Sequence, residues 1–196
     1  MAITKGVNIG CSDLQSSGGI RNILIRSCVT GDAVTYTNSA TAHAVSSIVD
    51  TGGSTATWHN YEFKNEIPTL TVTAARENGS TSYEATLTFM MPEMDSAKGA
   101  AIQALMDTCM MAIAVGNNGK QYVLGLSQKY ENEGVDPLRN QTYLSMTGVE
   151  GVSGAGVNDD NGYTVTLACK QWEALREYTG TLTLYSASNP GESTTS

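Results

Sequence analysis

The sequence predicts a mainly β domain, a β-sandwich or barrel with one flanking α-helix near residues 96–108. Two observations support this fold class: segments in which apolar and polar residues alternate recur along the chain, and only one long stretch has the apolar spacing of a helix. A length of 196 residues suits one domain. We therefore expect an N-terminal arm at 1–19, a single β-sandwich domain at 20–185 and a flexible tail at 186–196.

Strands are expected throughout the first half of the chain. The short β runs before the first clear hairpin are 20–27, 34–37, 44–49 and 57–65. In the last of these runs, Trp58 lies on one face of the strand, and His59, Tyr61 and Phe63 lie on the other. This part of the sequence therefore predicts several short strands separated by turns.

The clearest signal is a hairpin at 70–90. Residues 70–74 and 83–89 both alternate, with apolar side chains on one face and Thr on the other. Asn78-Gly79 lies between the two runs, and a tight hairpin turn favours this pair because both of its central residues need a positive φ. Thr is β-branched and suits a pleated surface.

A helix is expected at 96–108. Asp95 or Ser96 can cap its start, and the segment is rich in Ala and Met without β-branched runs. At helical spacing, one face carries Ala97, Ala101, Ala104, Leu105 and Thr108. We expect this face to cover one open end or side of the sandwich.

The second half begins with another hairpin, 110–115 and 121–126, around Gly116-Asn-Asn-Gly-Lys120. An acidic loop is expected at 128–162. Six acidic residues and one arginine give its 131–160 portion a net charge of −5. Within the loop, 141–146 can form a strand and 148–162 has a Gly/Ser-rich loop composition. Strands at 163–167 and 181–185, separated by a mixed segment, complete the domain.

Composition excludes some functions. The chain has 11 Lys and Arg against 19 Asp and Glu, a net charge of −8, which is the wrong sign for a domain that grips nucleic-acid phosphates. No segment has the ~18 consecutive apolar residues of a membrane-spanning helix. The cysteines at 11, 28, 109 and 169 lack the close spacing of a zinc site, and the first residues lack an export signal. We therefore expect reduced, structural thiols.

Catalytic and ligand-binding motifs are not found. His43 and His59 are the only histidines, and neither has a nearby acid or nucleophile pattern. Gly116–Lys120 joins two strands and lacks the spacing of a phosphate-binding loop. Asn158–Gly162 offers oxygen ligands for calcium but has no downstream glutamate and no flanking helices. The sequence predicts no catalytic, cofactor-binding or metal-ligating residues and a protein that is not an enzyme.

These parts together resemble the tail tube proteins of tailed bacteriophages and the related tubes of contractile injection systems. The resemblance rests on the Met-Ala-Ile-Thr start, the Asn78-Gly79 hairpin, the helix at 96–108, and the strand pairs after the helix. Lys120–Gly125 belongs to those pairs, and Asp160–Leu167 follows near the end of the chain.

The resemblance implies a homo-oligomer. Copies would form rings, expected to be hexameric, whose sheets join into an inner barrel, and the rings would stack into a tube through the arm, the hairpin or the long loop. The tube would be part of a virion, assembled in the host cytoplasm together with other tail proteins. DNA would pass along an acidic or neutral lumen without specific binding.

Three alternatives remain open at the level of sequence. The first is another virion role, as a tail completion or ring protein or a head decoration protein. The second is a carbohydrate-binding β-sandwich module, for which Trp58, Tyr61, Trp172 and Tyr178 are the candidate stacking aromatics. The third is an enzyme, which would need convergent acids or a nucleophile paired with histidine.

Overall fold

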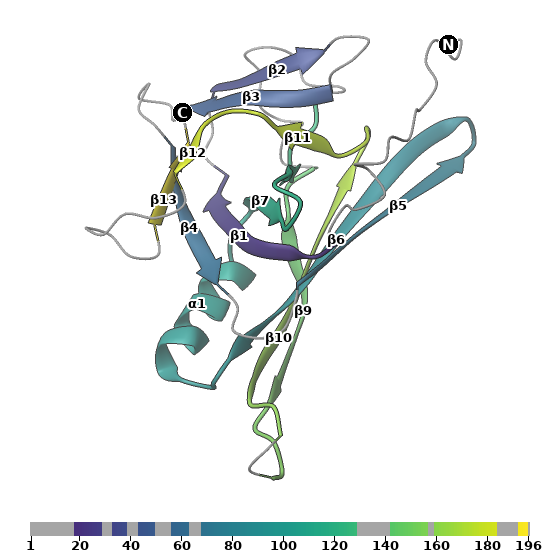
Figure 1. Ribbon diagram of the computed structural model, residues 1–196. Helices are drawn as coiled ribbons and strands as arrows, with labels where there is room; N and C mark the ends of the chain where they lie inside the picture. Colours follow the sequence, from purple (N-terminus) through teal and green to yellow (C-terminus); the bar gives the residue numbers. More distant parts are fainter. Residues whose placement is uncertain are drawn as a thin grey trace.

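The computed structural model describes residues 18–28, 33–38, 43–49, 56–62, 68–128, 142–156, 159–183 and 192–195. The described residues form two β-sheets and one α-helix (Figure 1), which confirms the predicted fold class. None of the described helical residues forms a span long and apolar enough to cross a lipid bilayer.

The larger sheet has nine strands in the order β12-β13-β4-β1-β7-β8-β11-β3-β2. Its strands are β1 (Ile20–Ser27), β2 (Ala33–Asn38), β3 (His43–Val49), β4 (Ala56–Glu62), β7 (Met110–Gly116), β8 (Gln121–Leu124), β11 (Arg176–Tyr178), β12 (Leu182–Thr183) and β13 (Glu192–Thr195). All neighbours are antiparallel except β11 and β3, which are parallel. The sheet bends so that β3, near one end of the strand order, comes close to β13, near the opposite end of the order.

The smaller sheet has four strands in the order β5-β6-β10-β9, and all neighbours are antiparallel. It contains β5 (Thr69–Glu77), β6 (Ser80–Pro92), β9 (Ser145–Val152) and β10 (Gly162–Gln171). The predicted hairpin at 70–90 is confirmed: Asn78 and Gly79 form the turn between β5 and β6, with φ of 49° and 81°. These positive φ values are those that a tight hairpin turn requires.

Two apolar cores lie on opposite faces of the nine-stranded sheet. The sandwich core lies between the two sheets, and the concave core fills the hollow of the bent sheet. Strand β7 contributes to both cores: Met110, Ala112 and Ala114 enter the sandwich core, while Met111 and Ile113 enter the concave core. This explains why its sequence is apolar without alternation, as expected for a strand buried on both faces.

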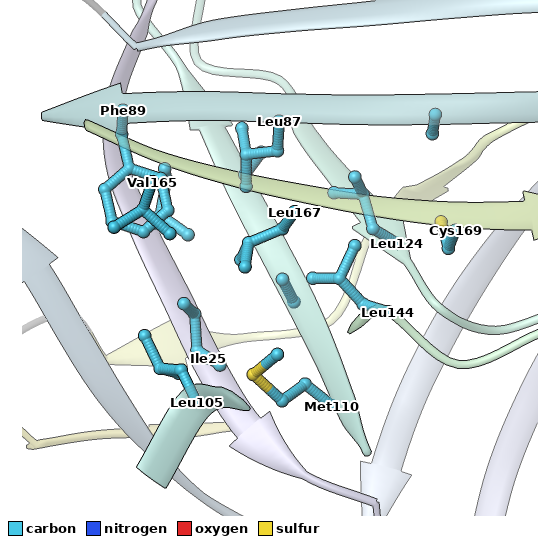
Figure 2. Close-up of a cluster of buried hydrophobic side chains, with 14 of the residues drawn as sticks. Ile25, Leu87, Phe89, Leu105, Met110, Leu124, Leu144, Val165, Leu167 and Cys169 are labelled. Atoms are coloured by element: carbon cyan, nitrogen blue, oxygen red, sulfur yellow. The ribbon is translucent and has the colours of Figure 1, made fainter. Parts of the chain in front are cut away.

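Figure 2 shows the sandwich core, where β6 and β10 face β1 and β7. Leu87 and Leu167 contribute from the four-stranded sheet, and Ile25 and Leu124 contribute from the larger one. Each fully buried side chain of this size contributes about 1.5–3 kcal/mol relative to an exposed one. The packing of the two sheets therefore fixes the orientation of the four-stranded sheet.

Helix α1 (Ser96–Met106) covers one side of the sandwich core. Its N-terminus is capped by Asp95, whose carboxylate accepts a hydrogen bond of 2.7 Å from the Lys98 backbone N–H. The residues that it buries are Ile102 and Leu105. The predicted apolar face was therefore wrong in part: Ala97 and Ala104 are exposed, because the larger side chains decide which side of the helix turns inward.

Two predicted segments differ from the structure. Residues 148–152, expected within the acidic loop, belong to β9, which pairs with β10 as far as Gly162↔Val152. Its glycines hid the strand pattern in the sequence. Residues 192–195, expected in the flexible tail, form β13 and pair with β4. The predicted arm is described only at residues 18 and 19, and 129–141 of the acidic loop lies outside the described residues.

Candidate functional site: the four-stranded sheet

The two faces of the four-stranded sheet differ sharply in chemistry. The inner face of β6 and β10 places apolar residues such as Leu87, Phe89 and Val165 in the sandwich core. On the outer face, the same strands carry Thr86, Thr88, Thr164, Thr166 and their neighbours, which are only partly covered. Because side chains alternate with period 2, one face of these strands packs in the core and the other faces solvent.

The outer face is mainly polar and weakly acidic, with Val152 at the end of β9 as an exposed apolar residue. By strand register it carries Thr69, Thr71 and Thr73 from β5 opposite Thr88, Thr86 and Glu84 of β6. Its charged side chains are Glu77, Glu84, Glu150 and Lys170, three carboxylates against one ammonium. Lys170 lies directly opposite Glu84. Short hydroxyl side chains and a small excess of negative charge make this a surface that does not attract phosphate.

Both edges of the sheet are unpaired among the described strands. Strand β5 is exposed along nearly its whole length, and β9 is exposed from Thr147 onward. Each edge carries an exposed valine on the inner face: Val72 of β5 is 43% exposed and Val149 of β9 is 40% exposed. An unpaired edge with apolar side chains is a surface that another strand can cover.

The sheet also extends at both of its ends. The β5–β6 turn at 78–79 lies beyond the end of β10 that contains Gln171, and the β9–β10 connection precedes Gly162 at the opposite end. In Figure 1 the β5–β6 hairpin reaches upward to the right of the other elements, and the β9–β10 connection reaches below them. The sheet therefore offers contacts in two opposite directions along its strands as well as at its edges.

The aromatic residues considered for sugar stacking do not form one surface. Trp58 is fully buried in the concave core, together with Tyr178. Tyr61 packs against the sandwich core, 6.1 Å from the Phe89 ring, and burial raises its pKa. Trp172, like Tyr61, is partly exposed, and Lys170 Nζ lies 6.0 Å from its ring centroid. The structure brings no two of the four together on an exposed face.

The structure places the other sequence candidates on strands and in turns of the described part of the chain. His43 Nε2 lies 2.8 Å from the Ala174 carbonyl oxygen, and His59 is exposed on β4. Gly116–Lys120 is the turn between β7 and β8, as predicted. The Asp159 carboxylate accepts hydrogen bonds from the backbone N–H groups of Ala155 and Gly156. No group of three or more metal-ligating side chains occurs among the described residues.

A buried polar cluster was missed at the level of sequence. The Arg176 guanidinium donates to both carboxylate oxygens of Glu173, at 3.1 and 2.8 Å, and to Gln128 Oε1 at 3.1 Å. It also lies 4.9 Å from the Tyr36 ring centroid. Burial raises the pKa of the Glu173 carboxyl. The hydrogen bonds that this carboxylate accepts from Arg176 and from the Gln128 backbone N–H, together with the Arg176 charge, lower the pKa more, so it lies below the usual range. Arg176 Nη1 also donates to the Ala44 carbonyl oxygen of β3, so the cluster links β11 to β2 and β3.

Cys28, Cys109 and Cys169 form no disulfide among the described residues, and Cys11 lies outside them. No protein-family model, no curated protein and no solved structure matches this chain.

Proposed function

We propose that this chain is a self-assembling structural protein of a phage virion, the subunit of a tail tube built from stacked rings. One observation carries the proposal: β6 and β10 of the four-stranded sheet have one face in the core and one polar face toward solvent, and both edges of the sheet are unpaired among the described strands. The resemblance in sequence organisation supplies the biological setting, in which the rings are hexameric and DNA passes through the lumen.

The strand directions allow such a sheet to continue from copy to copy. Because all neighbours in the order β5-β6-β10-β9 are antiparallel, β9 runs opposite to β5. Placing β5 of one copy beside β9 of the next therefore extends the sheet as another antiparallel pair. The two edges are different surfaces, so the contact is head-to-tail, which generates rings when the rotation closes.

The exposed valines support the same contact. Val72 and Val149 lie on the inner face of the two edges, each less covered than the inner-face residues of β6 and β10. Joining the edges would bring the valines of neighbouring copies toward each other and would satisfy the unpaired backbone groups. The sandwich core would then continue from one subunit to the next.

The outer face suits a surface along which DNA moves. Joined sheets would present their Thr-rich, weakly acidic faces on one side of the ring. Proteins hold DNA by neutralising its phosphates with Lys and Arg. A surface with three carboxylates and one lysine per copy offers little of that attraction. DNA would therefore slide through rather than bind.

Negative-stain electron microscopy of the purified chain at low and high concentration tests the proposal. We expect rings or stacked tubes of uniform width, whose end-on views give the ring order. A monodisperse monomer at every concentration would refute the proposal, and single closed rings that never stack would favour a tail completion or ring protein.

An edge variant makes the test specific. Val72→Lys places a charge on the β5 edge, where it should abolish rings while the monomer keeps its circular dichroism spectrum, because Val72 is outside the core. Met106→Lys is the matched control, since Met106 is an even more exposed apolar residue, at 56%, on α1 rather than on either edge. We expect rings from the control. Rings from Val72→Lys would show that β5 is not the contact.

A further inference from the structure

Two cysteines that are far apart in sequence lie opposite each other at one end of the β1–β7 pair. The register of these strands ends with Ser27 opposite Met110, so the next residues, Cys28 and Cys109, are directly opposite. The Cys28 backbone N–H donates a hydrogen bond of 2.9 Å to the Cys109 carbonyl oxygen, which shows that the pairing continues to these residues.

The geometry of such a pair allows a covalent bond. Directly opposite residues in an antiparallel pair point to the same face of the sheet, and in a hydrogen-bonded pair their Cα atoms are about 5.5 Å apart. Disulfides span Cα separations of roughly 4.4–6.8 Å. Both cysteines are half-buried, and neither forms a disulfide in the structure. The Cα separation expected for this pair therefore lies within the range that a disulfide spans.

We propose that Cys28 and Cys109 form a latent cross-strand disulfide, closed by a small-molecule disulfide such as oxidised glutathione. One cysteine thiolate attacks the glutathione disulfide, forms a mixed disulfide and releases one glutathione thiolate. The second cysteine thiolate then attacks the protein sulfur of the mixed disulfide and releases the other glutathione. The two cysteines lose two electrons to the glutathione disulfide, and their two protons end on the two released thiols.

The third described cysteine does not compete in this reaction. Cys169 is buried in the sandwich core, where desolvation raises its pKa to about 11. The thiolate is the species that attacks a disulfide, so Cys169 remains unreactive while the fold is intact. It serves as an internal control for any oxidation experiment.

The bond would link β1 and β7, the two strands that contribute side chains to both cores. It would close a loop from 28 to 109, which contains β2 to β6 and α1, and would fasten the end of β1 to the start of β7. Such a loop gains stability chiefly by restricting the unfolded chain. This inference concerns the single subunit, so it holds or fails independently of the proposed ring assembly.

Native oxidation of the wild-type chain tests the inference without any variant. The chain is incubated with oxidised glutathione, alkylated, digested and mapped by mass spectrometry. We expect a peptide pair joined through Cys28 and Cys109, with Cys169 alkylated only after denaturation. Separate glutathione adducts on the two cysteines, or a bond from either of them to Cys11, would overturn the inference.

Thermal unfolding gives a second measurement. We expect the oxidised chain to unfold on the order of 5–10 °C higher than the reduced chain. Cys109→Ser should abolish this difference, whereas Cys11→Ser should preserve it. Equal unfolding temperatures of a mapped oxidised sample and its reduced counterpart would show that the bond strains the strands and does not stabilise them.

Discussion

The Glu173–Arg176 pair determines how one buried carboxylate responds to pH. The pKa of Glu173 lies below its ordinary value of 4.5, because the hydrogen bonds from Arg176 and from the Gln128 backbone outweigh the effect of burial. A lowered pKa in the folded state means that the carboxylate stabilises the fold above the unfolded pKa. This contribution is lost as the pH falls below about 4.5 and passes through the folded pKa.

We therefore expect Glu173→Gln to lower the free energy of unfolding at pH 7 by about 1–3 kcal/mol, with the deficit shrinking as the pH falls below 4.5. Urea denaturation at several pH values measures this. Glu177→Gln is the control, because the Glu177 salt bridge to Lys120 is largely exposed and worth less than about 1 kcal/mol. A deficit that stays constant down to pH 3 would mean that the charge of Glu173 is not what stabilises the cluster.

At the scale of the element, glycine has a steric role at one end of β10. Gly162 lies between Pro92 of β6 and Val152 of β9, and a Cβ added to it would overlap the Met91 carbonyl oxygen. We expect Gly162→Ala to destabilise the fold by about 1–3 kcal/mol, as overpacking does. Denaturant titration followed by circular dichroism measures the loss.

Gly148 provides the matched comparison, since it pairs with Thr166 of the same strand and a Cβ there would meet nothing within 4 Å. Gly148→Ala should leave the unfolding midpoint nearly unchanged. If the two variants had equal midpoints, the close approach of β6 to the start of β10 would not be a constraint on the sequence.

At the scale of the whole molecule, β1 and β7 belong to both cores, so neither core can unfold without removing strands from the other. We predict one cooperative transition. Trp58 reports on the concave core by fluorescence once Trp172 is replaced by Phe, and far-UV circular dichroism reports on all strands. Leu167→Ala changes only the sandwich core and should lower the free energy of unfolding by about 2–5 kcal/mol. The unfolding curves followed by Trp58 fluorescence and by circular dichroism should shift by the same amount. A Trp58 transition that does not move would show that the cores unfold separately.

The fold was predictable where local signals and long-range packing agree. Asn78-Gly79 between two alternating runs was enough to place a hairpin, and the Ala-rich stretch after Asp95 was enough to place α1. Strand β9 was missed in part because Gly148 and Gly151 interrupt the alternation, and its pairing with β10 supplies what its own sequence lacks.

The candidate site was only partly predictable for the same reason. The polar face of the β5–β6 hairpin follows from period 2, so the sequence indicated it. Which strands become edges depends on pairings between residues up to about half the chain apart, and no local pattern encodes them. The opposition of Cys28 and Cys109 likewise exists only once β1 lies beside β7.

The alternation of β6 and β10 has a consequence for evolution and engineering. Selection for a stable core acts on residues such as Leu87 and Leu167, while the hydroxyl residues between them are exempt from that selection. Thr86 and Thr166 are therefore positions where a side chain of different charge or size should cost little stability. The expected loss is at most the modest difference in β-propensity between threonine and its replacement. Substitutions at these positions could change the charge of this surface from acidic to basic without changing the fold.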